Sequence, residues 1–221
     1  MKSTESVTTL RSPAKGSSRR NLGSAVLAAA LLYWTTHAMA IEEPAYTVEL
    51  SDDIFEIRTY SERIVAQTNV SGSFEDAGDT AFDKLFGYIS GDNEAREKIA
   101  MTAPVSQNAC ADGDGTDGSG EVESCWQLSF TMPSDHNIGT LPSPDNSAVE
   151  LSKLPPGRFA VVRYSGFWSK NNYQSYRQRL ESWMSVRDFV PAGGDTWARY
   201  NAPFTPWFLR RNEILVPIES S

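Results

Sequence analysis

Apolar and polar residues alternate along two neighbouring stretches near the start of the regular pattern. These stretches are IFEIRTY at residues 54–60 and RIVAQTNV at residues 63–70. A period of two is typical of strands with one buried face, so both are predicted to be β-strands. Only Ser61 and Glu62 separate them, which predicts that they pair with each other as an antiparallel hairpin.

A change to helical spacing follows the second stretch and lasts until Gly91. Apolar residues then recur every three or four positions, which indicates one amphipathic helix. Ser71 and Ser73 precede it and offer capping hydroxyls, and glycine is a common residue at a helix end. The apolar face of this predicted helix comprises Ala77, Ala81, Phe82, Leu85 and Ile89.

The same order of elements recurs later in the chain. AVELSKLP at 148–155 and RFAVVRYSG at 158–166 read as strands, and a helix follows from Ser169. Its apolar face comprises Tyr173, Tyr176, Leu180, Trp183 and Met184. The two copies are separated by 94 residues from Glu56 to Glu150 and again from Gly72 to Gly166. A constant offset of this kind indicates an internal duplication.

Extended segments close each half of the chain. They lie at 98–110 and 125–133 in the first half and at 197–201 and 213–219 in the second. One sheet and one helix per half cannot bury their apolar faces alone. We therefore expect an α+β fold in which a pseudo-two-fold duplicated unit forms one curved antiparallel sheet or distorted barrel, flanked by two α-helices.

Residues 1–40 have the pattern of an export signal rather than of a folded domain. Five basic residues and one acid precede an uncharged, largely apolar run at 22–34, and Ala38-Met39-Ala40 matches a signal peptidase site. Arg19 and Arg20 leave twin-arginine and ordinary Sec export both open. We expect cleavage after Ala40, a single domain at 41–221, and a periplasmic or secreted protein with no stable membrane insertion.

Charge argues against a nucleic-acid partner. The chain has 20 basic and 28 acidic residues, a formal net charge of −8, and removal of residues 1–40 leaves 15 against 27, or −12. A molecule with this excess of acid repels a phosphate polyanion. Nucleic acid is therefore not an expected partner.

The two cysteines of the chain flank a Gly- and Asp-rich segment at 111–124. In an oxidising compartment, Cys110 and Cys125 are predicted to form a disulfide at the base of a hairpin, with this segment as the loop. A reactive thiol or a metal site is the alternative, but the segment offers few further ligands.

Three short motifs carry a family resemblance. They are KIAMTAPV at 98–105, FTMP at 130–133 and RRNEILV at 210–216, and EIRTY and GYISGDN accompany them. On these motifs the chain resembles the SOUL haem-binding protein family over residues 54–218. The resemblance implies a duplicated barrel-like α+β domain that binds haem or a related tetrapyrrole non-covalently, without a firm axial ligand.

The resemblance also implies a site on the first helix, with basic residues near the carboxylates of the ligand. Carried onto this sequence, the macrocycle would contact Phe82, Leu85, Phe86 and Ile89, and Lys84 would pair with a carboxylate. The family carries an arginine where this chain has Asp79. The alternative is that the apolar stripe is core, in which case an exposed Phe86 would be the informative residue.

Further candidates come from outside the helix. His136 is the one histidine left after removal of residues 1–40 and could coordinate iron, or lie in a solvated turn. Met101 and Met132 could flank a haem or fill the core. Arg210 and Arg211 could bind propionates, or face solvent beside an acid such as Glu213.

These observations favour an exported tetrapyrrole carrier or buffer. The chain has no GxSxG, P-loop, HExxH or dinucleotide motif, so no catalytic constellation is recognisable. A tetrapyrrole-modifying enzyme and a binding domain for another apolar molecule or a protein are the alternatives.

Overall fold

A computed structural model describes residues 41–74, 76–110 and 124–219. Residues 41–221 form a compact unit of their own. The signal-peptide prediction at 1–40 and most of the predicted loop at 111–124 lie outside the described residues. None of the described helices is both long enough and apolar enough to cross a membrane.

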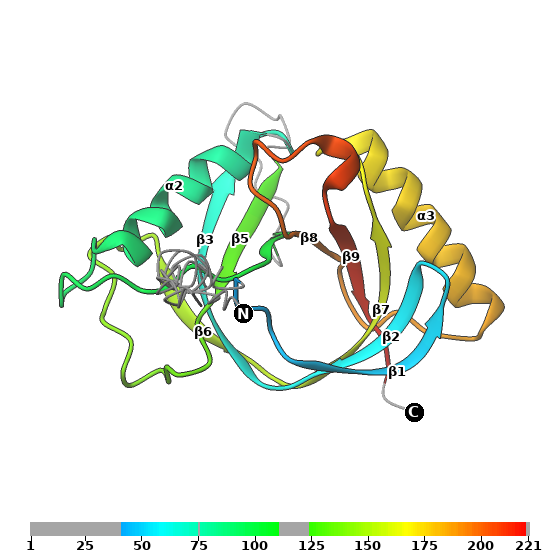
Figure 1. Ribbon diagram of the computed structural model, residues 1–221, viewed down its shortest axis with the longest axis horizontal. Helices are drawn as coiled ribbons and strands as arrows, with labels where there is room; N and C mark the ends of the chain where they lie inside the picture. The colour runs from blue at the N-terminus through cyan, green and yellow to red at the C-terminus, as the bar shows by residue number, and fades with distance from the viewer. Residues whose placement is uncertain (1–40, 75, 111–123, 220–221) are drawn as a thin grey trace, which may run out of the picture. The chain divides into compact units, whose positions relative to one another are not determined.

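The described unit is built on one nine-stranded antiparallel sheet, in the order β1-β2-β7-β9-β8-β4-β5-β3-β6. The strands are β1 (Tyr46–Asp52), β2 (Phe55–Tyr60), β3 (Arg63–Ser71), β4 (Val105–Ala109), β5 (Cys125–Thr131), β6 (Glu150–Leu154), β7 (Gly157–Tyr164), β8 (Thr196–Arg199) and β9 (Asn212–Pro217). Figure 1 shows the sheet curving, with the two helices on its outer side. The expected α+β fold is confirmed, and the sheet is curved and open rather than a closed barrel.

The predicted duplication appears as a two-fold pattern in the strand order. From the central pair β8 and β4 outward, β9 matches β5, β7 matches β3, and β2 matches β6. Gly72 and Gly166 follow the matching strands β3 and β7 with φ values of +137° and +134°. This backbone conformation favours glycine, which explains why both copies keep it.

The predicted pairing of the first two strands is wrong. β2 pairs with β1 and β7, whereas β3 pairs with β5 and β6. The first strand of each half therefore joins the sheet of the other half, and β1 is a strand that the pattern did not predict. The pairing of β4 with β8 at the centre joins the two half-sheets into one continuous sheet, and the exchange places β2 and β6 on its outer strands β7 and β3.

The helices α2 (Asp76–Ser90) and α3 (Lys170–Val186) begin at capped residues as predicted. The Ser73 hydroxyl accepts a hydrogen bond from the Asp76 N–H, and the Ser169 hydroxyl accepts one from the Asn172 N–H. α2 packs on β3 and β5, and α3 packs on β7 and β9. A third buried cluster, on the other face of the sheet, comprises Tyr60, Val161, Ala198 and Leu215.

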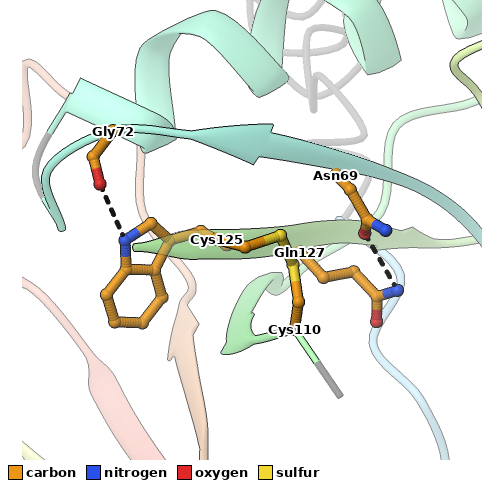
Figure 2. Close-up of a disulfide and its surroundings, with 6 residues drawn as sticks. Asn69, Gly72, Cys110, Cys125 and Gln127 are labelled. Carbon is orange, nitrogen blue, oxygen red and sulfur yellow. Dashed lines mark hydrogen bonds between the residues drawn. A yellow bond between two sulfur atoms is a disulfide. The ribbon is translucent and has the colours of Figure 1, made fainter. Parts of the chain in front are cut away.

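The predicted disulfide joins Cys110 to Cys125 at the end of the β4–β5 ladder where the connection between the two strands begins (Figure 2). The Cys110 N–H also donates to the Cys125 carbonyl oxygen at 3.1 Å. Nearby, the Trp126 indole donates to the Gly72 carbonyl oxygen. The crosslink therefore lies close to the turn that leads into α2.

Candidate functional site

Helix α2 divides the predicted ligand face into a buried part and an exposed part. Leu85 and Ile89 are 0% and 4% exposed, because β3 and β5 cover that side of the helix. These two predicted ligand contacts are core residues. Phe86 is 47% exposed, and its ring stacks on that of the partly buried Phe82 at 5.7 Å between centroids. The aromatic pair Phe82–Phe86 is the part of the helix that a ligand can reach.

Lys84 does not flank this aromatic pair. At 100° per residue, it lies about 160–200° around the helix axis from Phe82 and Phe86. The geometry of a regular helix thus directs Lys84 away from a ligand placed on the two rings. The role of Lys84 as a carboxylate partner stays a prediction, and the helix geometry argues against it on this face.

An apolar pocket of about 270 Å³ lies beside the first turns of α2. It is formed between this helix, the segment before β4, and the end of β8 with the loop that follows. Its lining residues are Ile41, Gly78, Asp79, Phe82, Met101, Thr102, Ala103, Val105, Trp168, Arg199, Tyr200, Asn201, Ala202 and Pro203. Phe82 belongs both to this pocket and to the exposed aromatic pair, so the two features form one site.

Arg199 supplies a cation to this pocket. Its guanidinium lies over the rings of Trp197 and Trp168, at 4.8 and 5.4 Å from the ring centroids. The buried Nε has no hydrogen-bond partner, and Nη2 donates to the Gln107 side-chain oxygen at a long 3.4 Å. Among the described residues, Arg199 forms no ion pair with a carboxylate within 4.0 Å. The pocket therefore contains hydrogen-bonding capacity suited to an anion.

Arg199 stays protonated although its guanidinium is buried. Burial lowers the pKa of Arg199 to about 10, and the negative charge of Asp79 opposes that fall. A guanidinium with this pKa is still protonated at neutral pH. A cation between two tryptophan rings is also stabilised by cation–π interaction.

Gly78 allows the guanidinium to lie against the helix. A Cβ atom at this position would sit 3.1 Å from Nη1 of Arg199, closer than nearly all ordinary contacts. Arg199 was not among the predicted site residues, because the segment WARYN was interpreted only as an extended segment. The available signal was an arginine two residues after a tryptophan, at the end of a short strand.

The predicted propionate partners Arg210 and Arg211 lie outside the lining of this pocket. Arg210 donates to the carbonyl oxygens of Pro203 and Thr205 and lies over the Trp168 ring. Arg211 pairs with Glu43 and with Glu213. Glu213 is fully buried, so the alternative of a solvent-facing pair with this acid is wrong, whereas the propionate role of the two arginines stays a prediction.

His136 also lies outside the pocket. It lines a separate cleft of about 400 Å³ near the ends of β5 and β6, and its Nε2 is 3.8 Å from Asp135. The described residues contain no group of three or more His, Cys, Asp or Glu side chains placed to hold a metal. Of the two methionines, Met132 is core, whereas Met101 lines the pocket of Arg199.

Comparison with solved structures supports the fold. The C-terminal domain of EcmrR aligns with a TM-score of 0.54 at 10% identity, over 80% of this chain and 99% of that one. A hydrolase from Listeria innocua aligns with a TM-score of 0.52 at 10% identity, over 77% and 94%. At these identities the likeness concerns the fold alone.

Comparison with known sequences identifies the family. Heme-binding protein 2 from Homo sapiens is 29% identical over 175 residues, which is 72% of this chain and 79% of the relative. The protein of the same name from Mus musculus is 26% identical over 194 residues, 79% of this chain and 88% of the relative. The family model described as SOUL heme-binding protein matches residues 41–217, most of the chain. The chain therefore belongs to the SOUL heme-binding protein family.

Proposed function

We propose that this protein binds haem or a closely related tetrapyrrole on α2, with one edge of the macrocycle in the pocket of Arg199. The single observation that carries this proposal is the Phe82–Phe86 ring pair beside an apolar pocket whose cation, Arg199, has no described carboxylate within 4.0 Å. The names of the human and mouse relatives support the same ligand.

The chemistry of the residues fits such a ligand. A tetrapyrrole is flat and aromatic, which suits offset stacking on phenylalanine rings. Haem carries carboxylates at one edge, and a guanidinium forms strong charge-assisted hydrogen bonds with carboxylates. The pocket is somewhat smaller than the roughly 300–1,000 Å³ of sites that enclose a drug-sized ligand, so it suits one edge of the macrocycle.

The proposed binding is non-covalent and without a strong axial ligand. Both cysteines are used in the disulfide, so no thiol is free for covalent attachment. Met101 offers a thioether at the pocket, and the lining contains no histidine. Affinity would then come from ring stacking, burial and the carboxylate contact rather than from the iron.

We further propose that the protein is exported and acts as a periplasmic or secreted carrier or buffer. Residues 1–40 support this with a basic segment, an apolar run and an A-x-A site, and the family match begins at residue 41. The disulfide suits an oxidising compartment. A carrier rather than an enzyme is favoured, because Asp79 is the one carboxylate in the described lining and has no histidine or cysteine beside it.

Titration of the protein lacking residues 1–40 with hemin tests the proposed site. We expect a saturable Soret shift at one equivalent, weakened about tenfold or more in the F86S variant, because the exposed ring contributes stacking and apolar contact. V186S is the matched control, since Val186 is an exposed apolar residue on α3. Unsaturable binding, or equal binding by F86S and V186S, would remove the site from α2.

A further inference from the structure

Five large apolar side chains that do not line the pocket gather on two neighbouring segments. We call them the aromatic patch; their exposed fractions run from 49% for Trp207 to 89% for Phe204. The members are Phe167, Phe204, Trp207, Phe208 and Leu209. Apart from Phe86, every strongly exposed Phe or Trp among the described residues belongs to this patch. Such a concentration of exposed apolar surface marks an interaction site.

The aromatic patch is held in shape by specific contacts. Phe167 stacks on Trp207 at 5.2 Å, and the Gly166 N–H donates to the Trp207 carbonyl oxygen at 3.0 Å. These contacts join the segment before α3 to the short 3-10 turn η1 (Trp207–Leu209), which Figure 1 shows beside the N-terminal end of α3. Arg210 fixes the preceding loop through the carbonyl oxygens of Pro203 and Thr205. These contacts hold the loop in place while its apolar side chains remain exposed.

A basic groove adjoins the aromatic patch, and Leu209 belongs to both. The groove has a volume of about 560 Å³, and its lining includes four arginines and two acids. These residues are Arg163, Arg179, Arg210, Arg211, Asp53 and Glu56. Glu56 is paired with Arg58, and Arg211 with Glu43 and Glu213.

Two arginines of the groove remain open to an anion. Arg163 and Arg179 are exposed, and neither forms an ion pair with a described carboxylate; Arg179 lies over the Tyr176 ring. Of the two acids of the groove, Asp53 is the one that forms no ion pair among the described residues. The local excess of positive charge contrasts with the net charge of −12 for residues 41–221.

We propose that the aromatic patch and the basic groove dock the protein onto an anionic phospholipid surface. Tryptophan and phenylalanine enter the headgroup region, while arginine side chains reach the phosphates. A peptide partner would instead need an apolar groove or a free sheet edge, whereas these side chains project from loops. The acidic remainder of the protein is repelled by the same surface, which fixes the orientation.

Docking has a consequence that rests on the proposed function. Trp168 and Pro203 line the pocket of Arg199 and also contact Arg210, which braces the loop of the aromatic patch. A docked protein would therefore hold its ligand pocket close to the lipid. An apolar pigment dissolved in the membrane could enter the pocket without crossing water.

Co-sedimentation with vesicles tests the docking without any pigment. Residues 41–221, which contain the whole described sheet and its core clusters, are mixed with vesicles of phosphatidylglycerol and phosphatidylcholine, or of phosphatidylcholine alone. We expect binding to the anionic vesicles that weakens with salt. It should fall at least tenfold in W207S/F208S and about fivefold for each arginine removed in R163Q/R179Q.

The control is V186S/V190S, which removes two exposed apolar side chains elsewhere on the molecule and should bind like the unaltered protein. Equal binding by W207S/F208S, no preference for anionic vesicles, or an equal loss in the control would overturn the proposal. The proposal would also be overturned if the unaltered protein did not bind vesicles but sedimented as a dimer, and if the W207S/F208S variant sedimented as a monomer. Hemin titration of W207S/F208S in solution tests the ligand pocket separately from the docking, because these two residues do not line the pocket.

Discussion

Arg58 and Glu213 form a buried ion pair that reaches across a strand. Arg58 Nη1 lies 2.8 Å from Glu213 Oε2, and Nη2 lies 3.2 Å from Oε1. Their side chains are 2% and 0% exposed, and β7 separates their strands β2 and β9 in the sheet. Glu213 also accepts hydrogen bonds from Arg211 and from the Tyr200 hydroxyl. One buried carboxylate therefore contacts two cations on the face of the sheet opposite the helices, and each cation also pairs with a more exposed acid, Glu56 or Glu43.

Replacing Glu213 by glutamine should strongly destabilise the fold. The substitution keeps the volume but removes the buried counter-charge of Arg58 and leaves it only the partly exposed Glu56, at a cost of about 3 kcal/mol. Urea unfolding measures the change. The control is E181Q on α3, which removes an exposed pair with Arg177 and should cost about 0.5 kcal/mol or less. Similar losses in the two variants would contradict the assigned role of the buried pair.

The same carboxylate should make stability depend on acid. Burial alone would raise the pKa of Glu213, but the hydrogen bonds and charges of Arg58 and Arg211 outweigh it and hold the pKa below its ordinary value. Its contribution is therefore fully present above the unfolded-state pKa of about 4.3 and is lost as the pH falls through the lower native pKa. The difference in unfolding free energy between the unaltered protein and E213Q should shrink below about pH 4. A difference that stays constant from pH 7 to pH 3 would show that the pKa of Glu213 is the same in the native and unfolded states.

Adjacent residues of α2 should respond in opposite ways to truncation. Leu85 is fully buried, so L85A should cost about 2–5 kcal/mol of unfolding free energy. Phe86 is exposed, so F86A should cost about 1 kcal/mol or less while weakening hemin binding. Thermal or urea unfolding and a hemin titration of both variants supply the comparison. Strong destabilisation by F86A would mean that its ring is structural.

Arg199 should form charge-assisted hydrogen bonds with the carboxylates of the ligand. A charge-assisted hydrogen bond contributes about 1.5–3 kcal/mol, so hemin should bind about ten- to hundredfold more tightly than its dimethyl ester. R199M should abolish this preference while leaving ester binding nearly unchanged. R163M, on the exposed Arg163 outside the pocket, should retain it. A preference that survives in R199M would place the carboxylate contact elsewhere without removing the aromatic site.

His136 should make no contribution to the haem spectrum. It lines the cleft near β5 and β6 rather than the pocket beside α2. H136A should therefore give the same Soret position and the same affinity for hemin as the unaltered protein. A spectral change that removes a nitrogen-ligated iron signature in H136A would instead establish axial ligation.

Much of the local structure could be predicted from periodicity and capping. The spacing of Tyr173, Leu180 and Met184 placed α3 on its core, and the recurring Gly72 and Gly166 revealed the duplication. The strand pairing could not be predicted this way, because a short separation such as Ser61–Glu62 does not decide which distant strand completes a ladder. Side-chain alternation fixes the face that a strand buries, not its neighbour.

The amino-acid sequence by itself determined both helices, most of the strands, the repeat, the disulfide partners and the family, because these depend on local spacing and on motifs. Only the tertiary structure decided which residues of α2 remain exposed and which cation stands beside them. Leu85 is covered because β3 and β5 pack on it, while Arg199 reaches α2 from β8, more than a hundred residues away along the chain. Burial and proximity between distant segments are properties of the packed chain, and no local pattern contains them.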